Sequence, residues 1–275
     1  MGIRSASTIK QLFSGFLFSC FPFLLNAQFT DSSTAGKKFI DTTTGNSFHA
    51  SGIRQKPKQI SATTFIVPAG LITYGFIALG KNDFGKINTN VKSELLEDHP
   101  AFITKIDNYL QYAPAVAVYA LNIAGIKGKN NFRDRSLIYA MSTLISSATV
   151  ISLKKITKVE RPDGSGNNSF PSGHTTTAFA AAEFLRMEYK DVSPWIGVAG
   201  YLTATATGIL RIYNNKHWVN DVVAGAGFGI LSTKLAYWIY PAIQKRLFKK
   251  TAVTTFISPY YQPGNAGFTL IHNFN

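Results

Sequence analysis

Six apolar segments occupy most of the chain between residues 64 and 240, and they constrain its fold more than any other feature. None of them alternates apolar and polar residues as a half-buried strand does, and Ala, Gly and Leu recur in them at helical spacing. The pattern therefore predicts an all-α body, a six-helix bundle. Its helices are expected over about 64–80, 109–126, 136–153, 173–187, 195–210 and 219–240, with longer loops at 81–108 and 154–172.

The chain before this body divides into two parts. Residues 1–27 have a basic start, an apolar run and Asn26-Ala27 as a plausible cleavage site, which predicts a signal peptide. A rival interpretation is lipoprotein processing at Cys20, the only cysteine of the chain. Residues 28–60 are polar and rich in Ser, Thr, Gly and Lys, so we expect a flexible linker. Cleavage at the predicted site would leave a mature chain without thiol or disulfide chemistry.

The chain after this body also changes character. Residues 61–250 form the predicted helical domain, and residues 251–275 form a short tail. Two apolar runs in the tail flank Pro263-Gly264-Asn265. A Pro-Gly turn between two such runs predicts a small C-terminal β-hairpin.

The charge of the chain points to an anionic partner. Its 28 Lys and Arg residues outnumber 14 Asp and Glu residues, which gives a formal net charge of +14. Such an excess favours nucleic acid, an anionic membrane or a phosphorylated substrate. The cations do not form one block and no nucleic-acid-binding motif is present, so we exclude nucleic acid as the partner.

Three polar clusters lie between residues 154 and 221. The helices from 136–153 to 219–240 are expected to alternate in direction, so the helix ends that carry the clusters meet at one end of the bundle. Lys154 and Arg161 would project from one face if both lay on a helix, and Asp221 could orient the ring of His217 four residues before it. The clusters are Lys154 with Arg161-Pro162, Pro171-Ser172-Gly173-His174, and Arg211 with His217 and Asp221.

Three cations, two histidines and one carboxylate suit the binding and hydrolysis of a phosphate group. The spacing within the three clusters also resembles the three-part signature of the type 2 phosphatidic acid phosphatase and vanadium haloperoxidase superfamily. The resemblance covers about residues 60–240. One departure is Leu210, where many members of that family have Ser. The resemblance implies a helical bundle of the acid phosphatase and haloperoxidase type.

The resemblance also implies a role for each matching residue. His217 would be the nucleophile that forms a phosphohistidine, and Asp221 would fix its tautomer. His174 would protonate the leaving oxygen. The phosphate would be bound by Lys154, Arg161 and Arg211, with Ser172 and Gly173 adding hydroxyl and backbone N–H groups. No cofactor is implied. No metal is implied either, because the three cations supply the positive charge.

Several functions remain open within this family. We expect a phosphatase acting on a phosphorylated lipid, such as phosphatidate, phosphatidylglycerol phosphate, polyprenyl pyrophosphate or a lipid A phosphate. The alternative is a soluble exported acid phosphatase that acts on small phosphate esters. A vanadate-dependent haloperoxidase is a remote third. The sequence leaves the oligomeric state open.

The basic segments predict which side of a membrane the site faces. The turn at 127–135 and the tail at 245–250 lie, by alternation, at the opposite end of the bundle from the three clusters. The positive-inside rule then places the clusters outside the cytoplasm. This agrees with a cleaved signal only if segment 64–80 does not cross. We expect an exported, membrane-associated protein with a periplasmic site; a soluble periplasmic protein is the alternative.

Overall fold

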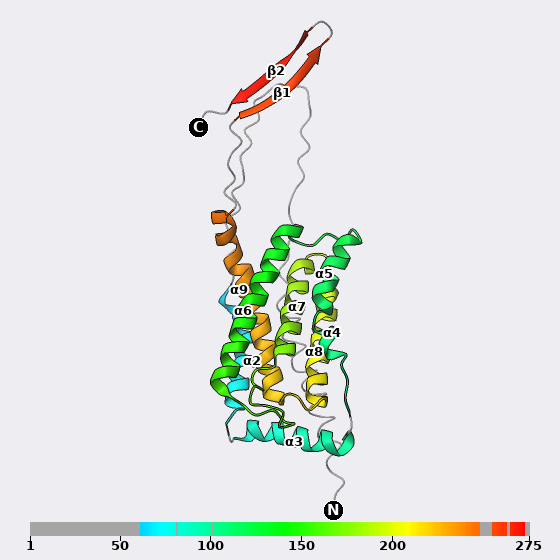
Figure 1. The fold of residues 1–275 in the computed structure, drawn as a ribbon, viewed down its shortest axis with the longest axis vertical. Helices are drawn as coiled ribbons and strands as arrows, with labels where there is room; N and C mark the ends of the chain where they lie inside the picture. The colour runs from blue at the N-terminus through cyan, green and yellow to red at the C-terminus, as the bar shows by residue number, and fades with distance from the viewer. Residues whose placement is uncertain (1–60, 81, 101, 248–254, 263–264, 273–275) are drawn as a thin grey trace, which may run out of the picture.

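The computed structural model describes residues 61–80, 82–100, 102–247, 255–262 and 265–272. The predicted signal peptide (1–27) and linker (28–60) lie outside the described residues. The described part is mainly helical (Figure 1), which confirms the prediction of a helical body. Its elements are η1 (Ala62–Phe65), α2 (Ile66–Ile77), α3 (Asp83–Asp98), α4 (Asp107–Leu110), α5 (Ala113–Ile123), α6 (Phe132–Thr157), α7 (Gly173–Tyr189), α8 (Pro194–Tyr213), α9 (Val219–Leu247), β1 (Thr255–Gln262) and β2 (Asn265–His272).

The count of six helices is too low. Each of the six apolar segments corresponds to a helix, but the described residues contain eight α-helices. The prediction of a loop over 81–108 is wrong for Asp83–Asp98, which form helix α3. This helix is polar, and few of its residues are buried. Asn82 caps α3 by accepting a hydrogen bond from the Gly85 N–H. A capped polar helix gives a weaker apolar signal than a core helix, which is why hydrophobicity alone missed it.

Helices α6, α7, α8 and α9 run alternately up and down (Figure 1), as the segment order predicted. Helix α7 lies at the centre and packs against α5, α6, α8 and α9. Its middle residues Ala181 and Phe184 are fully buried. On α9, a Cβ at Gly229 would lie 2.4 Å from the Thr176 carbonyl oxygen, so glycine allows α7 and α9 to approach closely. Small residues thus set the spacing at the centre of the bundle.

A buried charged group ties three helices together away from the helix ends. Glu183 on α7 is fully buried, and Arg186 donates to it at 2.6 and 2.7 Å. Lys234 on α9 lies 3.1 Å from the same carboxylate, and the Tyr201 hydroxyl on α8 donates to it. A buried carboxylate with two cations and a hydroxyl has its charge compensated, whereas removal of the carboxylate would leave the cations unpaired.

Among the residues that the structure describes, two helices are long and apolar enough to cross a membrane, namely Phe132–Thr157 and Val219–Arg246. Only 22% of the most apolar window of the first is buried inside the molecule, so the chain leaves most of this surface uncovered. The α2 helix has 12 residues, fewer than the ~20 that a transmembrane helix needs.

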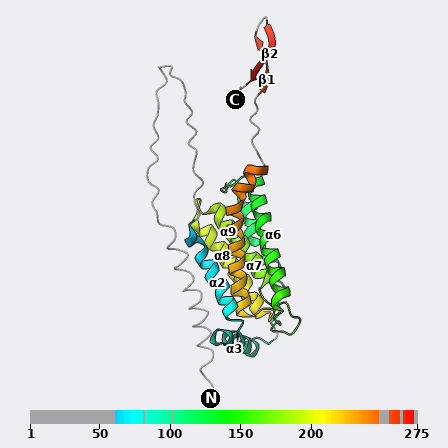
Figure 2. The same ribbon diagram turned by 90° about the vertical axis from the view of Figure 1, so that its left-hand side faces the viewer.

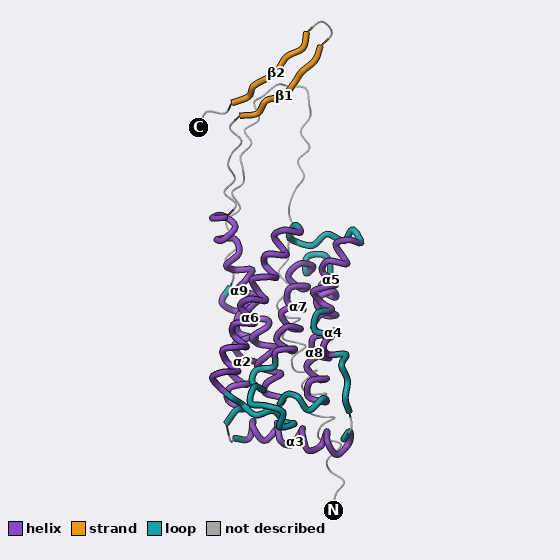
Figure 3. Tube along the Cα trace, viewed as in Figure 1, coloured by secondary structure: helices purple, strands orange, loops and turns teal. Residues whose placement is uncertain are grey.

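The two strands of the tail pair antiparallel. Their register places Thr255 opposite His272 and Gln262 opposite Asn265. Figure 3 shows these two strands in orange and the helices in purple.

Candidate active site

The three polar clusters lie at one end of the bundle. The chain reverses there between α6 and α7 and again between α8 and α9 (Figure 3). The α3 helix lies across the same end in both side views (Figures 1 and 2). Each cluster therefore lies at a helix end or in a loop next to it. Helix α3 covers this end of the bundle, although the sequence predicted a loop over its residues.

Lys154 and Arg161 reach the site in different ways. Lys154 lies in the last turn of α6, and its Nζ donates to the backbone carbonyls of Asn168 and Ser169, the second at 3.2 Å. Helix α6 ends at Thr157, and its C-cap residue Lys158 has a left-handed φ of 48°. Arg161 therefore lies in the loop that was expected over 154–172, and the two cations do not share a helical face. The loop folds back instead, and Arg161 Nε donates to Asn168 Oδ1 at 2.7 Å.

Arg211 is a buried cation in the last turn of α8. Its Nη1 donates to Asp107 Oδ2 at 2.6 Å, and Asp107 on α4 is itself buried. Within the part of the chain that the structure describes, Arg211 Nε and Asp107 Oδ1 have no hydrogen-bond partner. Arg211 also lies close enough to Lys154 and Arg161 for their charges to interact. The three expected cations thus form one positively charged group.

His217 and Asp221 form the expected pair. His217 precedes α9, and its Nδ1 lies 3.3 Å from Asp221 Oδ2. The same oxygen accepts from the Ser169 hydroxyl at 2.5 Å and from the Trp218 N–H at 2.9 Å. Because the carboxylate accepts the Nδ1–H, the lone pair of a neutral ring lies on Nε2. Burial lowers the pKa of His217 to about 4, although Asp221 acts in the opposite direction, so the ring is neutral at pH 7.

His174, the second residue of α7, lies at the same end. Its Nε2 is 2.8 Å from Asn108 Oδ1. Burial, reinforced by the charge of Arg211, lowers the pKa of His174 to about 4, while Asp107 acts to raise it. The cations that would bind a phosphate thus also disfavour a charged His174, and a bound phosphate dianion would offset their effect.

The backbone N–H of Ser172 does not face the position expected for a phosphate. Its N–H donates to the Asp221 carbonyl at 3.0 Å, so this group is engaged within the protein instead of pointing at a phosphate. Its hydroxyl is buried and caps α7 by accepting from the Thr175 N–H and hydroxyl. Ser172 therefore joins the start of α7 to the start of α9. Gly173 is the first residue of α7, where the N–H groups of a helix are free of intrahelical partners.

Two contacts hold the loop after α6 against the loop between α8 and α9. Lys216 Nζ lies 2.5 Å from Asp163 Oδ2, and the Trp218 indole N–H donates to the Glu160 carbonyl at 2.8 Å. These contacts join the loop carrying Arg161 to the loop carrying His217. They fix the relative positions of two clusters that are far apart in the sequence.

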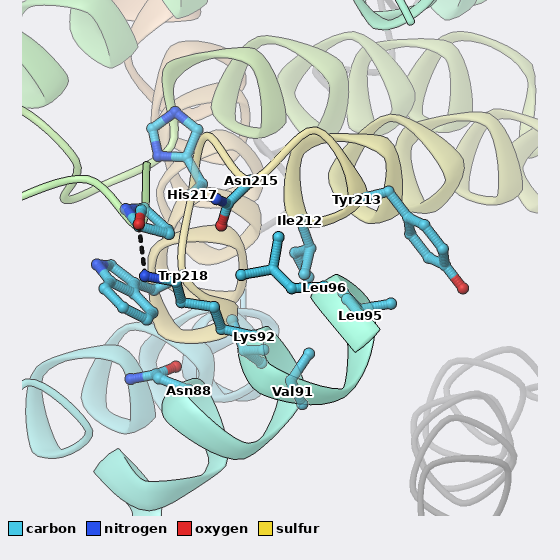
Figure 4. A pocket seen from close by; sticks show the side chains of 12 residues that line it. Asn88, Val91, Lys92, Leu95, Leu96, Ile212, Tyr213, Asn215, His217 and Trp218 are labelled. Carbon is cyan, nitrogen blue, oxygen red and sulfur yellow. Dashed lines mark hydrogen bonds between the residues drawn. The ribbon is translucent and has the colours of Figure 1, made fainter. Parts of the chain in front are cut away.

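A pocket lies between α3 and residues 212–219 (Figure 4). Lys92 reaches across it and donates to the Pro162 carbonyl at 2.6 Å, and its ammonium lies 5.3 Å from the centre of the Trp218 ring. The ring of His217 points away from the other lining side chains (Figure 4). The pocket therefore lies on the side of the His217 backbone that faces away from the imidazole ring.

Four polar residues at the site were not assigned by the sequence. Asp107 and Asn108 contact Arg211 and His174 from α4, while Asn168 and Ser169 contact Arg161 and Asp221 from the loop before α7. Ser169 precedes the second cluster by two residues, and this proximity was the one available signal. Asp107 and Asn108 lie over 40 residues before the first cluster, so only the fold brings them to the site.

The helical body of the chain is similar in sequence to known proteins. Residues 135–245 match the sequence profile of the PAP2 superfamily. Over 175 residues the chain is 38% identical to the lipid A 1-phosphatase of Porphyromonas gingivalis, covering 63% of this chain and 37% of that protein. Over 184 residues it is 26% identical to the lipid A 1-phosphatase of Helicobacter pylori strain J99, covering 65% of this chain and 88% of that protein.

One of the solved structures that are similar to this chain comes from Bacillus subtilis. It is the crystal structure of a transmembrane PAP2 type phosphatidylglycerolphosphate phosphatase from Bacillus subtilis, with 21% identity and a TM-score of 0.45. The match covers 64% of this chain and 97% of that one. The chain spans little more than a third of the Porphyromonas protein that it matches at 38% identity.

Proposed function

We propose that this chain, a member of the PAP2 superfamily, is a lipid phosphate phosphatase that works through a phosphohistidine and needs no metal ion. One observation carries the proposal. His217 is held in the nucleophilic tautomer by Asp221, beside three cations and a second histidine. This combination supplies a nucleophile, a proton donor and charge compensation for phosphoryl transfer.

The first half of the reaction transfers the phosphoryl group to the protein. His217 Nε2 attacks phosphorus and the bond from phosphorus to the ester oxygen breaks. His174, in its protonated form, gives its proton to the leaving oxygen. Asp221 stabilises the positive charge that develops on the ring of His217. The phosphate oxygens bind Lys154, Arg161 and Arg211 throughout.

The second half releases the phosphate. Neutral His174 takes a proton from a water molecule, whose oxygen attacks phosphorus as the bond to His217 breaks. Inorganic phosphate leaves and His174 is protonated again for the next cycle. In this scheme the three cations provide the charge that a metal ion provides in other phosphatases. Activity should therefore survive dialysis against EDTA.

A lipid phosphate is the favoured substrate class. Relatives from Porphyromonas gingivalis and Helicobacter pylori carry the name lipid A 1-phosphatase, so a lipid A 1-phosphate is the first substrate to test. Phosphatidate, phosphatidylglycerol phosphate and polyprenyl pyrophosphate belong in the same panel. The second candidate is a soluble exported acid phosphatase, and the remote one is a haloperoxidase. Detergent dependence separates the first two, and halide oxidation with added vanadate reveals the third.

The test uses the purified full chain with this lipid panel and with small phosphate esters. We expect release of phosphate from at least one lipid, and an acid-labile phosphoenzyme in the wild type. His217→Ala should lose at least about 10³-fold in rate, or ~4 kcal/mol at 1.36 kcal/mol per tenfold. It should form no phosphoenzyme. Robust turnover in His217→Ala would end the assignment.

Membrane association rests on the uncovered surface of α6. Leu144, Ile151 and Ile156 on this helix are exposed by 71%, 54% and 75%, in a helix long enough to cross a bilayer. We further propose that the site faces the periplasm. A reporter active only in the exported compartment should work when inserted in 163–169, whereas silence there together with activity at Lys250 would reverse the orientation.

A further inference from the structure

The short helix α4 brings two consecutive polar residues to the site. Asp107 contacts Arg211 on α8, and Asn108 contacts His174 on α7. The contact between Arg211 and Asp107 spans 104 positions, and that between His174 and Asn108 spans 66. Neither residue belongs to the three clusters, yet each touches a member of one. Of the two contacts, the one made by Asn108 determines which nitrogen of the His174 ring carries a hydrogen.

The Asn108 contact fixes one nitrogen of the His174 ring. The distance from His174 Nε2 to Asn108 Oδ1 is 2.8 Å, well within hydrogen-bonding range. An amide oxygen can only accept, so Nε2 carries a hydrogen. In a neutral ring the other nitrogen, Nδ1, then holds the lone pair, and in a charged ring it holds the second proton.

We propose that Asn108 is a positioning residue, which holds the hydrogen on His174 Nε2 so that Nδ1 delivers the proton to the leaving oxygen. This inference rests on the proposed function, in which His174 is the general acid. In the forward step the Nδ1–H bond breaks and the proton goes to the ester oxygen. In the second step Nδ1 takes a proton from water. The Nε2–H···Oδ1 hydrogen bond persists in both.

The charges around His174 explain why an acceptor is needed there. Arg211 from α8, Arg161 from the loop and Lys154 from α6 all oppose a positive charge on the ring, and Asp107 from α4 favours it. Together with burial they lower the pKa of His174 to about 4. A hydrogen bond to the charged form favours that form, so the Asn108 oxygen counteracts part of this effect.

The position of Asn108 is set by contacts that do not involve His174. Asn214, which follows α8, accepts from the Thr104 N–H at 2.9 Å and donates to the Thr104 carbonyl at 3.0 Å. Gln111 donates to the Asn108 carbonyl at 2.8 Å. These contacts hold the start of α4 against the end of α8. The backbone that carries Asn108 is therefore held in place by contacts that do not depend on substrate, which is what a positioning residue requires.

The activity test compares two variants of Asn108 with a matched control. Asn108→Ala should lose about 10- to 100-fold in kcat/KM on an alkyl phosphate, within the usual contribution of general acid catalysis. It should lose less than about threefold on nitrophenyl phosphate, whose leaving group needs no proton. Asn90→Ala, which alters an exposed amide on α3, should match the wild type on both substrates. Equal losses of Asn108→Ala on both substrates would overturn the proposal.

The pH profile distinguishes proton positioning from a merely structural role. Asn108→Asp keeps an acceptor and adds a negative charge, so it should retain activity on the alkyl phosphate. It should also move the alkaline limb of kcat/KM upward by about one pH unit or more, because an adjacent carboxylate favours the charged ring. An unmoved limb, or a loss as large as that of Asn108→Ala, would contradict the assignment of Nε2 as donor.

A measurement without turnover separates this inference from the proposed function. In ¹⁵N-histidine-labelled protein, with His174→Gln for assignment, the ring of His174 should carry its hydrogen on Nε2 at neutral pH. Asn108→Ala should lose this preference. A hydrogen on Nδ1 in the wild type would refute the inference even if the enzyme is active. The expected tautomer in a protein that hydrolyses none of the panel would support the positioning and refute the phosphatase.

Discussion

Asp221→Asn tests the central pair of the site with little change in shape. In the wild type, Asp221 Oδ2 accepts from His217, Ser169 and Trp218, and the other carboxylate oxygen is buried without a partner among the described residues. The substitution keeps the size of the side chain but removes its charge. It also replaces one of the two oxygens by an NH₂ group. This group can take the position that faces His217 or the buried position of the other carboxylate oxygen.

The expected loss follows from these two positions. If the amide oxygen faces His217, the hydrogen bonds remain but become neutral, which costs about 1 to 1.5 kcal/mol, or roughly tenfold in rate. The NH₂ group is then buried without an acceptor, at a further cost of about 1–3 kcal/mol in stability. If the NH₂ group faces His217, the hydrogen moves to Nε2 and the nucleophilic lone pair is lost. A comparable Asp→Asn change in serine proteases costs about 10⁴-fold.

We therefore expect kcat to fall between about tenfold and 10⁴-fold. The assay measures kcat on a lipid phosphate and on nitrophenyl phosphate, together with the amount of phosphoenzyme trapped from radiolabelled substrate. Asp83→Asn, at an exposed carboxylate on α3 that pairs with Lys86, is the control and should match the wild type. A rate of Asp221→Asn within threefold of the wild type, with normal phosphoenzyme formation, would refute this account of the pair.

Three further predictions concern the surroundings of the site. Ser169→Ala removes one donor to the buried carboxylate and should lower kcat about fivefold, equivalent to ~1 kcal/mol; an unchanged kcat would contradict its role. Glu183→Ala leaves two largely buried cations unpaired and should lower the free energy of unfolding by about 3–5 kcal/mol in thermal denaturation, whereas Glu97→Ala on the surface should not. The folded pKa values of His217 and His174 are about 4, below the ordinary value of 6.5, so the unfolded chain binds protons first as the pH falls. Stability should therefore decline from pH 6.5 towards pH 4, and His217→Gln should reduce that decline; a stability that rises over this window would contradict the buried neutral rings.

The sequence predicted the helices that are strongly apolar, and their order placed the clusters at one end. It missed α3 because that helix is polar, and an amphipathic surface helix gives little signal in average hydrophobicity. It ended the helix at about residue 153 and expected a loop over 154–172, whereas α6 continues to Thr157, so Lys154 lies on the helix and Arg161 in the loop. Spacing alone does not reveal where a helix ends, because the end depends on caps and on what the following loop contacts.

The sequence by itself determined the chemical groups of the site: two histidines, an orienting carboxylate and three cations, at spacings that short helices and loops preserve. The tertiary structure alone decided how these groups are held. Asp107 and Asn108 reach Arg211 and His174 through contacts across at least 66 positions, and the Ser172 N–H binds the Asp221 carbonyl instead of facing outward. The physical reason is that hydrogen bonding within one helix depends on local spacing, whereas buried polar groups take whichever partners the packed chain brings within reach.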